Sequence, residues 1–133
     1  MNSLSGIIKQ IEVNGSLSLV GIKVGECDFK SIVVETPDSA EFLKIDGPIS
    51  VLFKETEVII STDSNPQISL RNKMKATIQT IDKGTLLSKL TMDTNAGKVV
   101  SIITTNAVKQ LSLVEGGQVL AMVKTNEVLL SEC

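Results

Sequence analysis

The sequence predicts an all-β protein made of two tandem five-stranded Greek-key barrels that assemble into a homo-oligomer. Three observations predict this fold. The chain of 133 residues repeats itself, each half consists of short apolar segments between turn residues, and two of those segments are apolar on both faces. Hydrophobic residues make up 42% and charged residues 21% of the chain, which is typical of a folded protein.

The repeat becomes visible when residues 1–63 are aligned with residues 71–133, which requires no gap and gives 13 identical pairs. The match is densest near the end of each copy, where GPISVLFKETEVIIS aligns with GQVLAMVKTNEVLLS. Between the copies the chain is polar and turn-rich. The sequence therefore predicts a first module at 1–62, a linker at 63–68 and a second module at 69–133.

Five strands are expected in each module, because short apolar segments alternate with turn residues. In the first module the expected strands are 6–13, 17–24, 29–35, 49–53 and 58–61. The pairs Asn14-Gly15 and Gly25-Glu26 and the segment 94–97 are typical of hairpin turns.

One short helix is expected in each module. In the first module it starts at Thr36, with Pro37 in the first turn, and in the second module it starts at Asn106. Five short strands and one short helix in about 60 residues fit a small Greek-key barrel of the OB type.

Assembly is expected because the strands at 49–53 and 119–123 are apolar on both faces. A module of this size buries only about 60% of the surface of its unfolded chain. A barrel with water outside would expose half of the side chains of these two strands. The sequence therefore predicts burial against a second copy, in a tight homo-oligomer.

The composition excludes several functional classes. The chain has no His, so it lacks the commonest general base and every Ser–His or Cys–His pair, and we do not expect an enzyme. A net charge of -2 and an aromatic content of 2% argue against nucleic-acid binding. Cys27 and Cys133 have no metal-type spacing, and no glycine-rich phosphate loop occurs.

The expected location is the cytoplasm. No apolar run approaches the length that spans a bilayer, and the first residues lack the basic and apolar regions of a secretory signal. We therefore expect no membrane insertion.

Three groups of residues could bind an anion. Ser69, Arg71 and Asn72 offer a hydroxyl, a guanidinium fork and an amide, which together suit a tetrahedral oxyanion. A solvated linker end explains the same residue types equally well. Lys124 and Thr125 add an ammonium and a hydroxyl, although an ordinary polar turn would contain such residues too.

The third group is the junction between a strand and a helix at 102–106, which includes Thr104. Hydroxyls and free N–H groups at the start of a helix favour anions. Thr and Asn are also common helix caps, so capping alone could explain this junction.

The second half resembles a known family. The strings SLRNKMKATIQTIDKG and IITTNAVKQLSLVEGGQVLAMVKTNEVLLS resemble the molybdate-binding Mop module of the TOBE superfamily. The pattern of that module opens with S-A-R-N-x-L-x-G-x-V and closes with K-[AS]-x-[DE]-V-[ILM]. The first half resembles a more divergent copy. A pair of such modules is similar to the di-molbindins, and also to the effector-binding part of the molybdate-responsive regulator.

The resemblance implies an OB-like barrel with oxyanion sites between modules of different subunits. It implies that molybdate or tungstate is the ligand, bound without direct coordination of a metal by side chains. The residues carried over are Ser69, Arg71, Asn72, Lys124 and Thr125, with Thr104 from a neighbouring subunit.

In the first module the resemblance implies a weaker site at most. Asn2 and Lys54 are kept, but Met1 and Val34 stand at the positions of Arg71 and Thr104. The first module is therefore expected mainly to build the assembly.

Three functions are compatible with the sequence. The favoured one is storage of molybdate or tungstate for molybdenum homeostasis in the cytoplasm, by a homo-oligomer that is a trimer rather than a dimer by analogy with the di-molbindins. A second is a molybdate-sensing module that lacks a DNA-binding domain and acts through a partner protein. A third is an accessory TOBE module associated with a molybdate ABC transporter, against which the anion-binding residue types argue.

Overall fold

The computed structural model describes all residues, 1–133, and it confirms the expected all-β class. The only α-helix has six residues, and no helix is long and apolar enough to cross a membrane. The first five strands are β1 (Asn2–Asn14), β2 (Leu17–Val24), β3 (Cys27–Val33), β4 (Pro48–Phe53) and β5 (Ile59–Ser61). The second five are β6 (Asn72–Lys83), β7 (Leu87–Thr94), β8 (Gly97–Thr104), β9 (Gln118–Val123) and β10 (Leu129–Ser131).

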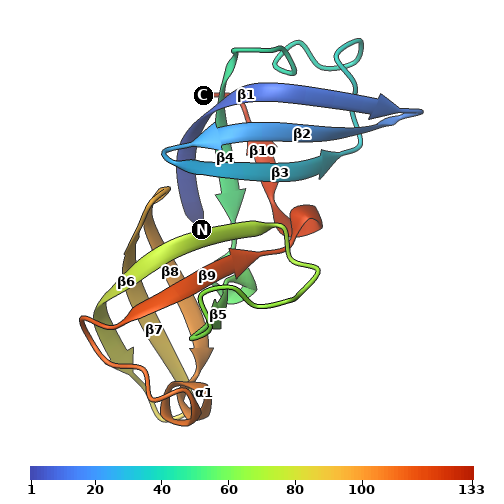
Figure 1. Cartoon of the computed structure of the whole chain (residues 1–133). Helices are drawn as coiled ribbons and strands as arrows, with labels where there is room; N and C mark the ends of the chain where they lie inside the picture. Colours follow the sequence, from blue (N-terminus) through green and yellow to red (C-terminus); the bar gives the residue numbers. More distant parts are fainter.

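The strands form two curled antiparallel sheets, which lie one above the other in Figure 1. The first sheet has the order β10-β4-β1-β2-β3, and the second sheet has the order β5-β9-β6-β7-β8. The two halves of the chain therefore exchange their last strands. Ile60 of β5 pairs with Ala121 of β9, and Leu130 of β10 pairs with Val51 of β4.

The longest strand of each sheet serves two partners. β1 pairs with β4 along its first half and with β2 along its second half, and the register shifts between Ile8 and Gln10. In β6 the shift lies at the equivalent place, between Ile78 and Thr80. A bulge bends a strand and increases its twist, which allows one long strand to curl a five-stranded sheet toward a barrel.

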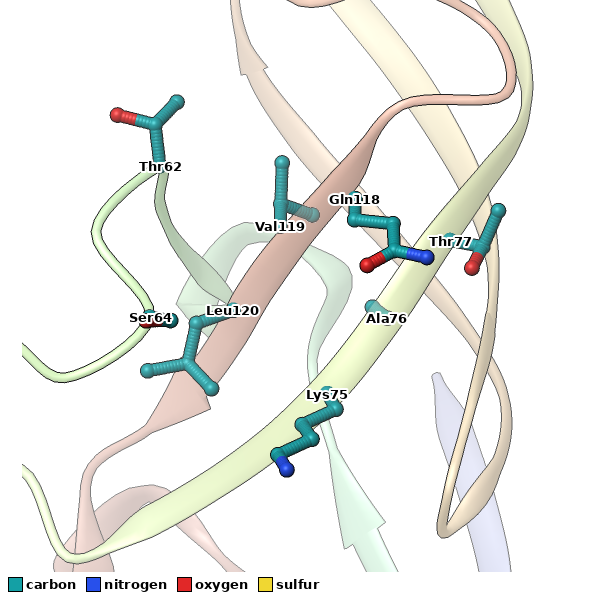
Figure 2. A pocket seen from close by; sticks show the side chains of 8 residues that line it. All are labelled: Thr62, Ser64, Lys75, Ala76, Thr77, Gln118, Val119 and Leu120. Atoms are coloured by element: carbon teal, nitrogen blue, oxygen red, sulfur yellow. The ribbon is translucent and has the colours of Figure 1, made fainter.

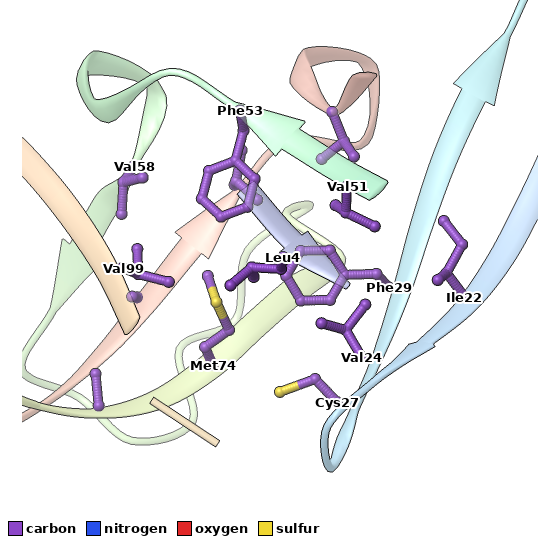
Figure 3. Packing of buried hydrophobic residues seen from close by; sticks show 14 of the residues in the cluster. Leu4, Ile22, Val24, Cys27, Phe29, Val51, Phe53, Val58, Met74 and Val99 are labelled. Carbon is purple, nitrogen blue, oxygen red and sulfur yellow. The ribbon is translucent and has the colours of Figure 1, made fainter. Parts of the chain in front are cut away.

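The core is continuous between the two sheets. Phe29 and Phe53 of the first sheet have ring centroids 6.1 Å apart. Met74 and Val99 of the second sheet belong to the same cluster of 24 buried residues, as Figure 3 shows. A shared core explains how two modules, each of marginal size, are stabilised within one chain.

The outer face of β9 is covered within the chain. Leu120 and Met122 point away from the main core, and Leu70, which lies two residues before β6, packs on them in a small separate cluster. The expectation that β9 needs a second copy for its burial is therefore wrong, because the start of the second module covers it within one chain. All four residues from Leu120 to Val123 are buried in a single chain.

The short helix of the second half is present as α1 (Thr105–Gln110), one residue earlier than expected. The helix expected at Thr36 in the first half is not formed. The chain makes a single turn there, in which the backbone N–H groups of Ser39 and Ala40 both donate to the Thr36 carbonyl at 2.9 Å. The capping position explains the difference. Thr104 caps α1 through its hydroxyl, whereas its equivalent in the first half is Val34, which has no side-chain acceptor.

Two single-turn 3-10 helices were not expected. They are η1 (Glu55–Glu57) and η2 (Thr125–Glu127), and each connects a sheet to the exchanged strand that follows it. η1 packs against β8 and η2 packs against β3, so each lies at the joint between the two halves.

Candidate functional site

Arg71 and Lys124 come together at one end of the second sheet. Asn72 of β6 pairs with Val123 of β9, so the residue before Asn72 and the residue after Val123 leave the sheet side by side. Both cationic side chains are exposed. The three ion pairs of the protein involve other groups, so neither cation is paired with a carboxylate. This end of the sheet therefore offers two free positive charges.

Hydroxyl groups flank the two cations in the sequence. Ser69 is exposed and lies two residues before Arg71. Thr125 is half-buried and begins η2, directly after Lys124. The backbone around Lys124 is held by η2, because the Lys124 carbonyl accepts a hydrogen bond from the Glu127 N–H at 2.9 Å. Cations and hydroxyls gathered in this way can donate charge-assisted hydrogen bonds to an anion.

Asn72 is fully buried, and both polar atoms of its amide are already engaged. Its Oδ1 accepts from the backbone N–H of Lys30 at 2.7 Å, and its Nδ2 donates to the Lys30 carbonyl at 2.9 Å. Lys30 lies on β3 in the first half of the chain. The amide therefore joins the two sheets directly beneath Arg71.

Thr104 lies at the opposite end of the second sheet. It is the last residue of β8 and pairs with Leu87, close to the end of β6 where Lys83 pairs with Ser88. Its hydroxyl accepts a hydrogen bond from the Ala107 N–H at 3.1 Å. A single chain therefore does not bring Thr104 to Arg71 and Lys124.

The equivalent place in the first half differs in charge. Asn2 joins the two sheets in the same way as Asn72 does. Its Nδ2 donates to the Val100 carbonyl and its Oδ1 accepts from the Val100 N–H, both at 2.8 Å. Lys54 is exposed there, like Lys124. However, Glu55 occupies the position of Thr125, and its carboxylate accepts a hydrogen bond from the Met1 ammonium at 2.7 Å. That bond holds the pKa of Glu55 below its usual range, so Glu55 is an ionised carboxylate paired with the Met1 ammonium.

An open pocket of about 430 Å³ lies elsewhere, on the outer face of β6 and β9 beside the linker (Figure 2). Lys75 is its one cation, and Thr62, Ser64 and Thr77 supply hydroxyls. None of the residues selected from the sequence lines this pocket. The sequence carried no signal for it, because it depends on how the linker lies on the sheet.

Comparison with known proteins identifies the family. A TOBE domain model matches residues 68–130. The molybdenum-pterin-binding protein 2 of Clostridium pasteurianum is 31% identical over 64 residues, which are 47% of this chain and 94% of that protein. The molybdenum transport protein ModE of Azotobacter vinelandii is 26% identical over 133 residues, which are 98% of this chain. The chain spans 49% of the length of that ModE relative.

A solved structure resembles the whole chain. The cytoplasmic molybdate-binding protein ModG, in a form with molybdate bound, superposes with a TM-score of 0.88 and 24% sequence identity. The alignment covers 99% of this chain and 96% of ModG. It confirms the expected pair of OB-like barrels.

Two curled five-stranded sheets define a protein of two tandem OB-like β-barrels. The chain belongs to the TOBE family, in which it is a tandem of two Mop-type modules.

Proposed function

We propose that this protein binds molybdate or tungstate reversibly in the cytoplasm and stores it for molybdenum homeostasis. The observation that carries the proposal is that Arg71 and Lys124 adjoin the strand pair Asn72 and Val123 at one sheet end, and that neither cation has an acidic partner. The named relatives bind molybdate or are named for molybdenum, which supports the choice of ligand.

The proposed site acts by charge and hydrogen-bond donation. The planar guanidinium of Arg71 and the ammonium of Lys124 match the two charges of a tetrahedral dianion. Ser69 and Thr125 add hydroxyl donors from the flanking residues. The chain has no His, the commonest general base, and we propose that the bound anion is held and released unchanged. The protein is accordingly a binding protein and not an enzyme.

The proposed site is completed by a neighbouring subunit. Thr104 lies at the rim of an apolar groove of about 410 Å³ between β5 and β8. Ile59 and Leu87 line this groove and are about half exposed, and their repeat equivalents Leu129 and Leu17 are similarly exposed. Two matching apolar patches on one chain are suited to contacts between copies. We favour a homotrimer over a dimer, by analogy with the di-molbindins, with Thr104 of one subunit reaching the cations of the next.

The first half is proposed to bind the anion weakly or not at all. Asn2 is engaged in the joint between the sheets, and Lys54 is left as the only side-chain cation. The carboxylate of Glu55 stands where the second half has a hydroxyl, and a like charge repels an oxyanion. The first half then contributes structure more than binding.

A second candidate is a sensing role. The similarity to ModE of Azotobacter vinelandii extends over 98% of this chain, so a module that reports molybdate to a partner protein is also supported. Light scattering separates the two candidates, since the storage role predicts a trimer and the sensing role predicts a dimer. An accessory role at a molybdate transporter predicts no particular oligomeric state, but it predicts that the protein binds little anion. The unpaired cations Arg71 and Lys124 argue against this third role.

Titration calorimetry with molybdate, tungstate, sulfate and phosphate tests the proposal. We expect saturable binding of molybdate and tungstate and none of sulfate or phosphate. Arg71→Ala should lower the affinity for molybdate at least about tenfold, since it removes a charge-assisted hydrogen bond. Lys75→Ala is the matched control, because Lys75 is an exposed cation four residues further along the same region. Equal losses in the two variants, or no heat with any anion, would overturn the proposed site.

A further inference from the structure

Two buried asparagines join the sheets with the same geometry. Asn72 is 0% exposed and Asn2 is 6% exposed, and each amide bonds both the N–H and the carbonyl of one residue on the other sheet. The bonded residues are Lys30 on β3 and Val100 on β8. The asparagines occupy equivalent positions of the repeat, and so do the residues that they bind.

The physical reason for this arrangement is the edge of each sheet. β3 and β8 are edge strands, which present unpaired N–H and C=O groups. A side-chain amide has one donor and one acceptor group at the spacing of a peptide unit, so it can satisfy both groups of a single residue. Because the bonds are buried, removing the amide leaves an N–H and a carbonyl of the backbone unpaired, which destabilises the fold.

β3 also bonds the segment that follows Lys124 and Thr125. Ser31, the residue after Lys30, is fully buried, and its hydroxyl donates to the Val128 carbonyl at 2.8 Å. Val128 directly follows η2, and η2 contains Thr125. Two neighbouring residues of β3 therefore bond the two parts of the candidate site. Lys30 bonds Asn72 at the start of β6, and Ser31 bonds Val128 at the end of η2.

We propose that Asn72 is a positioning residue, which holds Arg71, Lys124 and Thr125 in place against the first half of the chain instead of contacting the anion. This inference rests on the proposed function. It differs from the role carried over by family resemblance, in which Asn72 contacts the anion. We call the two hydrogen bonds between the Asn72 amide and the Lys30 backbone a clamp. Asn72 is adjacent to Arg71, and its pairing partner Val123 is adjacent to Lys124, so this clamp holds both strand ends that lead to the cations.

The equivalent contacts in the first half of the repeat provide a control for the role of Asn72. Asn2 and Val100 form the same clamp, and Ser101 donates to the Val58 carbonyl at 3.0 Å in the same way as Ser31 bonds Val128. This second clamp lies beside Met1 and Glu55, which stand at the positions of Arg71 and Thr125, so the guanidinium and the hydroxyl of the proposed anion site have no equivalent there. Variants at the two clamps therefore remove equivalent structure, and only one of them is next to the proposed site.

The experiment compares Asn72→Ala with Asn2→Ala in the full chain. Each variant should speed amide hydrogen exchange at its own partner, Lys30 or Val100, and the two should lower the thermal midpoint by similar amounts. Titration with molybdate should then show about a tenfold loss of affinity for Asn72→Ala and less than a twofold loss for Asn2→Ala. Unchanged affinity in Asn72→Ala, or equal losses in both variants, would overturn the positioning role.

Ser31→Ala and Ser101→Ala separate positioning from direct contact, and they also serve if the asparagine variants fail to fold. Ser31 is buried in the first half and bonded to the backbone, so it acts on the site only through Val128. A loss of molybdate affinity in Ser31→Ala and none in Ser101→Ala supports positioning. Wild-type affinity in Ser31→Ala overturns it in favour of direct contact by Asn72. If the wild-type protein binds no molybdate, the proposed function itself is wrong. Amide hydrogen exchange at Lys30 still reports whether Asn72 bonds Lys30 in that case.

Discussion

Glu55 and Thr125 occupy equivalent positions at the start of the two 3-10 helices, and they differ in the property that matters most to an anion. Glu55 is a carboxylate bonded to the Met1 ammonium, and Thr125 is a hydroxyl beside the unpaired Lys124. The two halves share their strand arrangement, and this pair of residues distinguishes their expected ligand chemistry.

Thr125→Glu should abolish useful molybdate binding. The substitution copies the first half into the second and places a carboxylate beside Lys124. Two like charges about 4 Å apart repel by about 1–4 kcal/mol near a protein surface, so the carboxylate should repel the proposed dianion. We expect the affinity measured by calorimetry to fall at least about tenfold. Thr125→Gln, which has a similar size and no charge, should lose much less. If the two variants bind equally, charge at this position is not the discriminating property.

The contact of Glu55 with the Met1 ammonium should make stability depend on pH on the acid side. The folded state lowers the pKa of Glu55, so its contribution is present above the ordinary glutamate pKa of about 4.3 and is lost as the pH falls through the lower folded value. The difference in thermal midpoint between wild type and Glu55→Gln should therefore be present at about pH 6 and vanish in strong acid. A difference that grows toward low pH would contradict the sign of this shift.

Phe53→Ala should destabilise both sheets together. Phe53 is fully buried in the cluster that also contains Met74 and Val99 of the second sheet. Truncation of a buried Phe costs about 3–5 kcal/mol. Because the core is shared, we expect one cooperative transition by circular dichroism, and faster exchange of protected amides in both sheets. Loss of protection in the first sheet alone would show that the two barrels unfold independently.

The two cysteines should differ sharply in reactivity. Cys27 is 4% exposed and its thiol contacts the Asn95 side chain at 2.8 Å, whereas Cys133 is exposed. Burial is the main cause that raises the pKa of the Cys27 thiol, and the nearby Asp28 adds to it. A thiol reagent at pH 7.5 should label Cys133 rapidly and Cys27 only on unfolding. Cys133→Ser should then leave a chain that the reagent barely modifies. Fast labelling of that variant would indicate that the hairpin at Cys27 opens readily.

Much of the secondary structure could be predicted from local patterns. The strand at Leu17–Val24 was expected with the bounds that the structure has, because apolar residues and turn pairs mark both of its ends. The helix at Thr36 was not formed, since Pro37 and the polar residues around it suit a turn as well as a helix start. The second half has a capping Thr104 at the equivalent of Val34, and this difference in residue type accompanies the difference in structure.

The strand exchange could not be read from the repeat. Residues 59–61 and 129–131 are equivalent in sequence, so each would fit the last position of either sheet equally well. Their destination depends on the path of the chain after η1 and η2. The same limit applies to Leu120 and Met122, which were expected to need a second copy and are covered by Leu70 at the start of the second module.

The sequence by itself determined the duplication, the all-β class and the residue types that suit an oxyanion, because these follow from periodicity and from the chemistry of single side chains. Only the tertiary structure decided that Arg71 and Lys124 share one sheet end and that Asn72 is engaged by Lys30. The reason is physical. Strand pairing and burial join residues that are far apart in the chain, and a buried amide takes its role from the backbone groups that it meets there.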